Sequence, residues 1–215
     1  MHSLVYDLVK DFHPLRWTSK YRRTTIPYLI IMVLFYHTIG VLVLAAGSLL
    51  IQNIIRDYNE PSIPITIFSV LFAGPIEETL FFGIPLYATG SHIVVMAGGI
   101  MWAMIHILNT PTVQLNALAY TNWLFVIPSI FLSFRTWISG KGWFAVVSHS
   151  MWNIAFFTLG CISGEFPCNV FYDKNGFSDI MMISIGSLLT ALTYFLYRRN
   201  VTKLKYRYDW SVHWS

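Results

Sequence analysis

Two adjacent glutamates, Glu77 and Glu78, lie in the middle of one of the most apolar stretches of the chain. Apart from this pair, no Asp, Glu, Lys or Arg occurs between Glu60 and Arg135. A charged side chain near the centre of a bilayer costs at least about 2.5 kcal/mol on insertion scales, so such residues usually serve a function. The pair is therefore the first candidate for a functional site.

Three further polar side chains lie inside apolar stretches, namely His106, His149 and Asn153. His149 and Asn153 are four residues apart, so on a helix they share one face. Trp102 precedes His106 by four residues, which places it one turn earlier on the same helix face. We expect Trp102 to form a wall of any pocket that His106 lines.

A carboxylate pair, two histidines and an amide could together perform hydrolysis. They supply a general base, a group that polarises water, and donors for a developing oxyanion. Histidine and glutamate also bind zinc, so Glu77, His106 and His149 are candidate metal ligands. Each residue also has a structural interpretation, because carboxylates can share a proton and polar side chains can join helices.

The composition indicates a membrane protein built from helices. Hydrophobic residues make up 55% of the chain and charged residues 11%, with a mean hydropathy of +0.56. A soluble domain has roughly 25% charged residues. The apolar runs are about twice as long as a transmembrane β-strand, which favours helices. The predicted class is therefore all-α, a polytopic membrane helical bundle.

The chain is predicted to form about six transmembrane helices, at residues 26–51, 65–87, 92–108, 115–134, 143–160 and 179–197. Gly74-Pro75 and Pro85 predict breaks in the second of these spans, close to the glutamates. Irregular backbone at membrane depth is tolerated where it lines a cavity. We expect a loop at 135–142 before the fifth span.

The basic residues predict the orientation of the spans. With both termini cytoplasmic, twelve of the fourteen Lys and Arg residues fall inside, and only Arg56 and Lys174 fall outside. This distribution fits topology and anionic lipid rather than nucleic acid. The predicted organisation is a basic interfacial segment at 1–25, a transmembrane bundle at 26–197 and a basic cytoplasmic tail at 198–215.

The location that follows is a multi-pass position in the plasma membrane, with the lipid bilayer as a partner. Cys161 and Cys168 then share an outer loop. In an oxidising exterior they could form a disulfide, and two separate thiols fit the sequence equally well.

The relative depth of the polar residues can be compared from the span boundaries. Glu77 and His106 each lie about 14 residues from the turn between the second and third spans, so they should be level. His149 lies only about 10 Å from the inner end of its span, against about 21 Å for the other two. Tilt or a broken second helix would have to close this gap.

The order Glu-Glu, then aromatic-x-x-x-His, then His-x-x-x-Asn resembles the CPBP family, which comprises CAAX prenyl endoproteases and bacteriocin-processing or Abi proteins. The resemblance covers residues 65–160, a protease-like core. It implies an intramembrane endopeptidase in which Glu77 with His106 activates water. His149 and Asn153 would then stabilise the oxyanion, with Glu78 supporting the site. Zinc and a metal-free glutamate mechanism both remain open.

Two positions depart from the pattern of that family. Phe82 stands where the family usually has Arg, and Trp102 replaces Phe. Without that cation, Glu77 and Glu78 could share one proton, as closely spaced carboxylates do. Phe82 and Trp102 are our candidate substrate-binding residues, and the expected substrate is a peptide or lipidated protein, including a prenylated CAAX chain.

Two other classes of function also fit these residues. The same polar cavity could belong to a non-catalytic membrane binding or immunity protein. Intramembrane Glu and His residues also form proton relays, so a proton-coupled transporter is a further alternative. Six spans with no inverted repeat make the transporter the weaker of the two.

Overall fold

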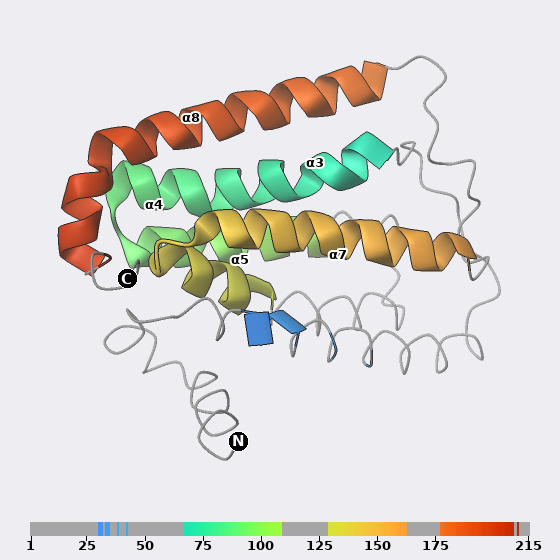
Figure 1. Cartoon of the computed structure of the whole chain (residues 1–215), viewed down its shortest axis with the longest axis horizontal. Helices are drawn as coiled ribbons and strands as arrows, with labels where there is room; N and C mark the ends of the chain where they lie inside the picture. The colour runs from blue at the N-terminus through green and yellow to red at the C-terminus, as the bar shows by residue number, and fades with distance from the viewer. Residues whose placement is uncertain are drawn as a thin grey trace.

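The computed structural model of the chain describes residues 67–108, 129–162, 177–208 and 210, together with the single positions 30, 31, 33, 34, 38 and 42. These ranges are helical except for the turns around residues 90 and 140 (Figure 1). The elements are α3 (Ile67–Glu78), the π-helix η2 (Thr79–Gly83), α4 (Ile84–Thr89), α5 (His92–Leu108), α7 (Gly142–Ile162) and α8 (Phe177–Tyr208). Residues 129–138 form a further helical segment, called segment 129–138 below. The predicted all-α class is confirmed for the described residues.

Two of the described helices are long and apolar enough to cross a membrane, Ile67–Thr89 and Asp179–Tyr208, and His92–His106 is a shorter apolar helix. The count of six spans and the cytoplasmic position of both termini stay predictions. The predicted segment 1–25, most of the spans 26–51 and 115–134, and Cys168 lie outside the described residues, whereas Cys161 belongs to α7.

The second predicted span is continuous, so the predicted break at Pro75 was wrong. Pro75 lies inside α3, and the helix runs on through η2 and α4 to Thr89. Proline has no N–H to donate to the carbonyl one turn earlier, which here belongs to Leu71. That carbonyl instead accepts a hydrogen bond of 2.8 Å from Ser150 Oγ of α7. Pro85 stands in the first turn of α4, a position where helices tolerate proline.

The helix widens into η2 directly after Glu78. The Thr79 hydroxyl donates to the carbonyls of Pro75 and Ile76 at the start of this segment. A π-turn holds more residues than an α-turn, and such segments are frequent at functional sites. The side chains of η2, including Phe82, therefore point in other directions than a regular α-helix would give them.

Glycines let the helices around the glutamates approach very closely. Helix α3 packs between α7 and α8, while α5 packs against η2 and α4 (Figure 1). A Cβ atom on Gly74 would lie 2.8 Å from both Ser150 N and Val146 O of α7. A Cβ atom on Gly98 of α5 would collide with the Phe81 carbonyl oxygen. Backbone contact therefore fixes α7 and α5 against the helix that carries the glutamates.

The loop predicted at 135–142 was wrong in its first half. Segment 129–138 continues past the predicted end at residue 134, and α7 begins at Gly142. Arg135 suggested a boundary, but a cation near the C-terminal end of a helix is favourable and does not end it. The chain turns instead at Gly140, whose φ of 78° suits glycine.

The last helix extends beyond residue 197, where we predicted its end, so the first part of the tail 198–215 is helical. Helix α8 runs to Tyr208 and bends near its C-terminal end (Figure 1). The Tyr208 hydroxyl donates to Gly90 O at 2.6 Å, and Trp210 Nε1 donates to Ile138 O at 2.8 Å. The C-terminal end thus holds both the turn between α4 and α5 and the turn before α7.

Replacing Trp210 with alanine should destabilise the bundle. Trp210 is 1% exposed, and its removal should cost about 3–5 kcal/mol of unfolding free energy. Thermal unfolding in detergent should show the loss as a lower midpoint. The matched control is Tyr206→Ala, because Tyr206 is 94% exposed. Equal midpoints for Trp210→Ala and the parent protein would contradict the role of this contact.

Candidate active site

The Glu77 side chain is the accessible member of the carboxylate pair, with 23% of its surface exposed. Its Oε2 atom accepts a hydrogen bond of 2.6 Å from Trp102 Nε1 of α5. The Nε2 atoms of His106 and His149 lie 3.5 and 3.6 Å from the same oxygen. Three side chains from two other helices therefore meet one carboxylate oxygen of α3.

The orientation of the His106 ring is set by its own helix. Nδ1 lies 2.9 Å from the carbonyl oxygen of Trp102, one turn earlier. Since a carbonyl oxygen only accepts hydrogen bonds, Nδ1 must carry the hydrogen in this contact. The Trp102 and His106 rings also lie 4.4 Å apart between their centres. The Nε2 atom is thereby directed at Glu77.

The Glu78 side chain is the sealed member of the pair, with 4% of its surface exposed. Ser133 Oγ donates to its Oε1 atom at 2.6 Å, and Trp137 Nε1 donates to its Oε2 atom at 2.8 Å. His149 Nδ1 lies 3.1 Å from Oε1. Three donors therefore offset the cost of burying this carboxylate.

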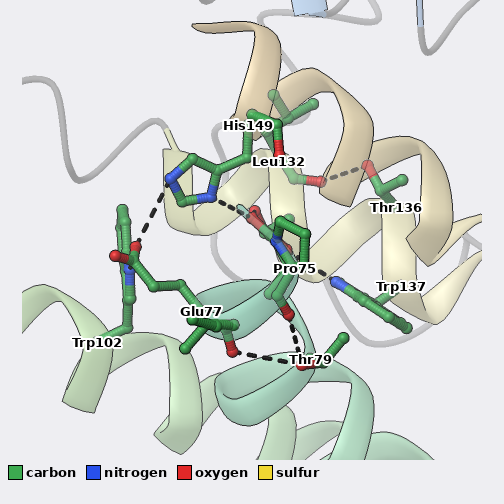
Figure 2. Close-up of polar contacts among 12 residues, drawn as sticks. Pro75, Glu77, Thr79, Trp102, Leu132, Thr136, Trp137 and His149 are labelled. Carbon is green, nitrogen blue, oxygen red and sulfur yellow. Dashed lines mark hydrogen bonds and ion pairs between the residues drawn. The ribbon is translucent and has the colours of Figure 1, made fainter. Parts of the chain in front are cut away.

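His149 bridges the two glutamates, with Nδ1 on Glu78 and Nε2 facing Glu77. Figure 2 shows a dashed line from its ring to the Glu77 carboxylate. The sequence predicted that His149 would lie less deep in the membrane than Glu77. In the structure the His149 Nε2 atom lies 3.6 Å from Glu77 Oε2. Backbone contact between Gly74 and Ser150, the residue after His149, brings α7 level with the glutamates.

The remaining predicted residues have different surroundings. Trp102 is buried and hydrogen-bonds to Glu77, so it contacts the site directly. Phe82 is 1% exposed and belongs to the hydrophobic core, where its ring lies against Gly99. Asn153 is half-buried, one turn after His149 on α7. The structure thus brings Glu77, Glu78 and both histidines together.

Three residues that form hydrogen bonds at or beside the site were not predicted from the sequence, namely Ser133, Trp137 and Ser150. Ser133 and Trp137 are four residues apart, the spacing that drew attention to His149 and Asn153. This signal was available, but the predicted loop at 135–142 separated the two residues. Ser150 follows His149 directly, and its role depends on a proline in another helix.

The described part of the chain contains no group of three or more His, Cys, Asp or Glu side chains placed to hold a metal ion. Glu77 Oε2 already accepts an indole N–H, and both Glu78 oxygens accept hydrogen bonds. A metal ion at these oxygens would compete with those donors. Zinc binding by Glu77, His106 and His149 stays a prediction.

The described fold is helical, with two helices long and apolar enough to cross a membrane, and it contains a buried glutamate–histidine network. Residues 59–155 match the family model described as Rce1-like, type II CAAX prenyl endopeptidase Rce1-like. This stretch holds all three motifs, so the predicted resemblance is confirmed over these residues, which are somewhat under half of the chain. No curated protein and no solved structure matched the chain.

Replacing Ser150 with alanine should weaken the packing of α7 on α3. The Leu71 carbonyl would lose its side-chain donor, at a cost of about 1–3 kcal/mol. A lower thermal unfolding midpoint in detergent would report the loss. Ser187→Ala is the control, since Ser187 is exposed on α8. If both variants unfold at the temperature of the parent, the contact is not stabilising.

Proposed function

We propose that this protein is an intramembrane endopeptidase that cleaves a peptide bond in a membrane-associated substrate of the prenylated CAAX type. Glu77 and His106 activate water, His149 and Asn153 stabilise the oxyanion, and Glu78 supports His149. The observation that carries the proposal is the approach of two histidine Nε2 atoms to one oxygen of Glu77. The family match supports CAAX-type endopeptidase activity in general.

The contacts of His106 favour a water molecule beside Glu77. With its hydrogen on Nδ1, neutral His106 presents a lone pair at Nε2, which faces a carboxylate oxygen at 3.5 Å. Two acceptors so close together are satisfied by a molecule that donates to both. Water does this with its two hydrogens and keeps its lone pairs available for attack.

The two glutamates have different roles in this scheme because their surroundings differ. Glu77 is accessible, so it can take a proton from water while the water oxygen bonds to the substrate carbonyl carbon. The carbonyl oxygen becomes the oxyanion. When the C–N bond breaks, the proton on Glu77 passes to the leaving amine nitrogen. Glu78 is sealed by three donors, which suits a supporting role.

His149 is suited to donate to the oxyanion. Its Nδ1–H group bonds to the Glu78 carboxylate, so a proton on Nε2 makes the ring a cation. Two carboxylates beside the ring balance that charge. The Asn153 amide lies one turn further along α7 and is the second donor of the proposal.

The substrate is proposed to reach this network from the bilayer. Trp102 lies beside both catalytic histidines, with ring centres at 4.4 and 5.9 Å, and we assign it to the wall of the substrate site. The location proposed is a multi-pass position in the plasma membrane. The match to a prenyl endopeptidase family supports a lipidated peptide as the first substrate to test.

Glu77→Gln and His106→Ala should each lower kcat by about 10²- to 10⁴-fold, because each removes a group that handles the water proton. The amide in Glu77→Gln keeps an acceptor for Trp102, so the fold should persist. The measurement is cleavage of a prenylated CAAX peptide by purified protein in detergent or liposomes, with thermal unfolding recorded alongside.

His92→Ala is the matched control for the histidine variant. His92 begins α5, whereas His106 lies near its other end. Undiminished turnover in Glu77→Gln would contradict the proposed role of Glu77 as the general base. Tight binding of the peptide by the parent protein without Glu77-dependent cleavage would instead favour a binding or immunity protein.

Cleavage should persist when divalent cations are removed with a chelator, because the proposed steps use only side chains of the chain. Activity and metal content are measured on the same sample before and after the treatment. Protein incubated without chelator serves as the control. Loss of activity that added zinc restores would overturn the metal-free form of the proposal and support the predicted zinc ligands.

A further inference from the structure

Segment 129–138 contributes two donors to the site that none of the three sequence motifs contains. Ser133 and Trp137 are four residues apart on one helix face and bind different oxygens of Glu78. Both side chains are buried, Trp137 completely. The two donors therefore fix both the position and the rotation of the Glu78 carboxylate.

The Trp137 ring lies in a slot between two glycines. A Cβ atom on Gly83 would lie 2.7 Å from the Trp137 Cη2 atom, and a Cβ atom on Gly142 would run into the ring. The rings of Tyr87 and Trp143 pack against it, with centres at 5.6 and 5.8 Å. This packing holds the indole N–H in one direction, toward Glu78.

We propose that Trp137 and Ser133 are positioning residues for His149, and that they act through Glu78. By fixing Glu78, they place its Oε1 atom 3.1 Å from His149 Nδ1. That contact sets which ring nitrogen faces the carboxylate and directs Nε2 toward Glu77 and the reacting carbonyl. The inference deepens the proposed function, because His149 donates to the oxyanion there.

The hydrogen bonds from Ser133 and Trp137 to Glu78 take the place of the cation that the family usually has at position 82. Phe82 is buried in the hydrophobic core, so no charged group reaches Glu78 from that position. An indole N–H and a hydroxyl supply directed hydrogen bonds in its place. Neither of these two groups carries a charge. Among the side chains that contact Glu78 here, His149 becomes a cation when its ring is protonated.

The test compares Trp137→Phe and Ser133→Ala with the parent protein in the peptide cleavage assay. Each change removes one donor to Glu78 and should lower kcat at least about tenfold with little change in KM, since misplacement by about 1 Å can cost about a hundredfold. In a Glu78→Gln background the same changes should have a much smaller effect. Full additivity would overturn action through Glu78.

One control variant makes the same kind of change away from Glu78. Ser139→Ala removes a buried hydroxyl that donates to Thr136 O. It should keep the kcat of the parent. A loss of kcat as large as that of the Glu78 donors would show a general packing effect and contradict the proposal.

A second readout does not depend on cleavage. In protein with ¹⁵N-labelled histidine, the ring signals of His149 should report its hydrogen bond to Glu78 and should shift in Trp137→Phe and Ser133→Ala. The signal is assigned by its loss in His149→Ala. Unchanged signals would overturn the inference. Shifted signals in a protein without Glu77-dependent cleavage would support the positioning role and reject only the proposed function.

Discussion

The structure around the site depends on burying the Glu78 carboxylate. A carboxylate at 4% exposure is stable only if donors replace its water, and here the donors are Ser133, Trp137 and His149. These residues come from two segments far from Glu78 in sequence. Segment 129–138 and α7 must therefore both contact the Glu78 carboxylate. These contacts also fix the direction in which the adjacent Glu77 side chain points.

Close helix contacts make that arrangement possible. Side chains of ordinary size would hold helix axes about 8–10 Å apart, whereas Gly74 and Gly98 let α7 and α5 touch the backbone of the glutamate helix. The hydrogen bond from Ser150 to Leu71 satisfies the carbonyl that Pro75 leaves without a donor. Gly74-Pro75 suggests a helix break in the sequence. In the folded structure it is the place where α7 packs against α3.

Local patterns predicted most of the described helices, while the contacts between segments could not be predicted from them. The apolar run 92–108 matched α5. Glu77, His106 and His149, which the motif order grouped, lie together in the structure, and their catalytic roles stay predictions. The tail beyond residue 197 was read from its charge, although its helical extension is held by Tyr208 and Trp210. The hydrogen bond from Tyr208 to Gly90 cannot be predicted from residue spacing, because the two residues are far apart in sequence and meet only in the folded bundle.

The surroundings of the two glutamates explain why the proposed mechanism assigns the general base to Glu77 and not to its neighbour. Adjacent residues on a helix point in directions about 100° apart, so Glu77 and Glu78 enter different environments. Glu78 meets donors on both oxygens and is closed to solvent, whereas Glu77 faces two imidazole rings and stays partly open. His149 joins the two environments, since one nitrogen binds Glu78 and the other faces Glu77. A change in segment 129–138 can thus alter the surroundings of Glu77 without contacting it.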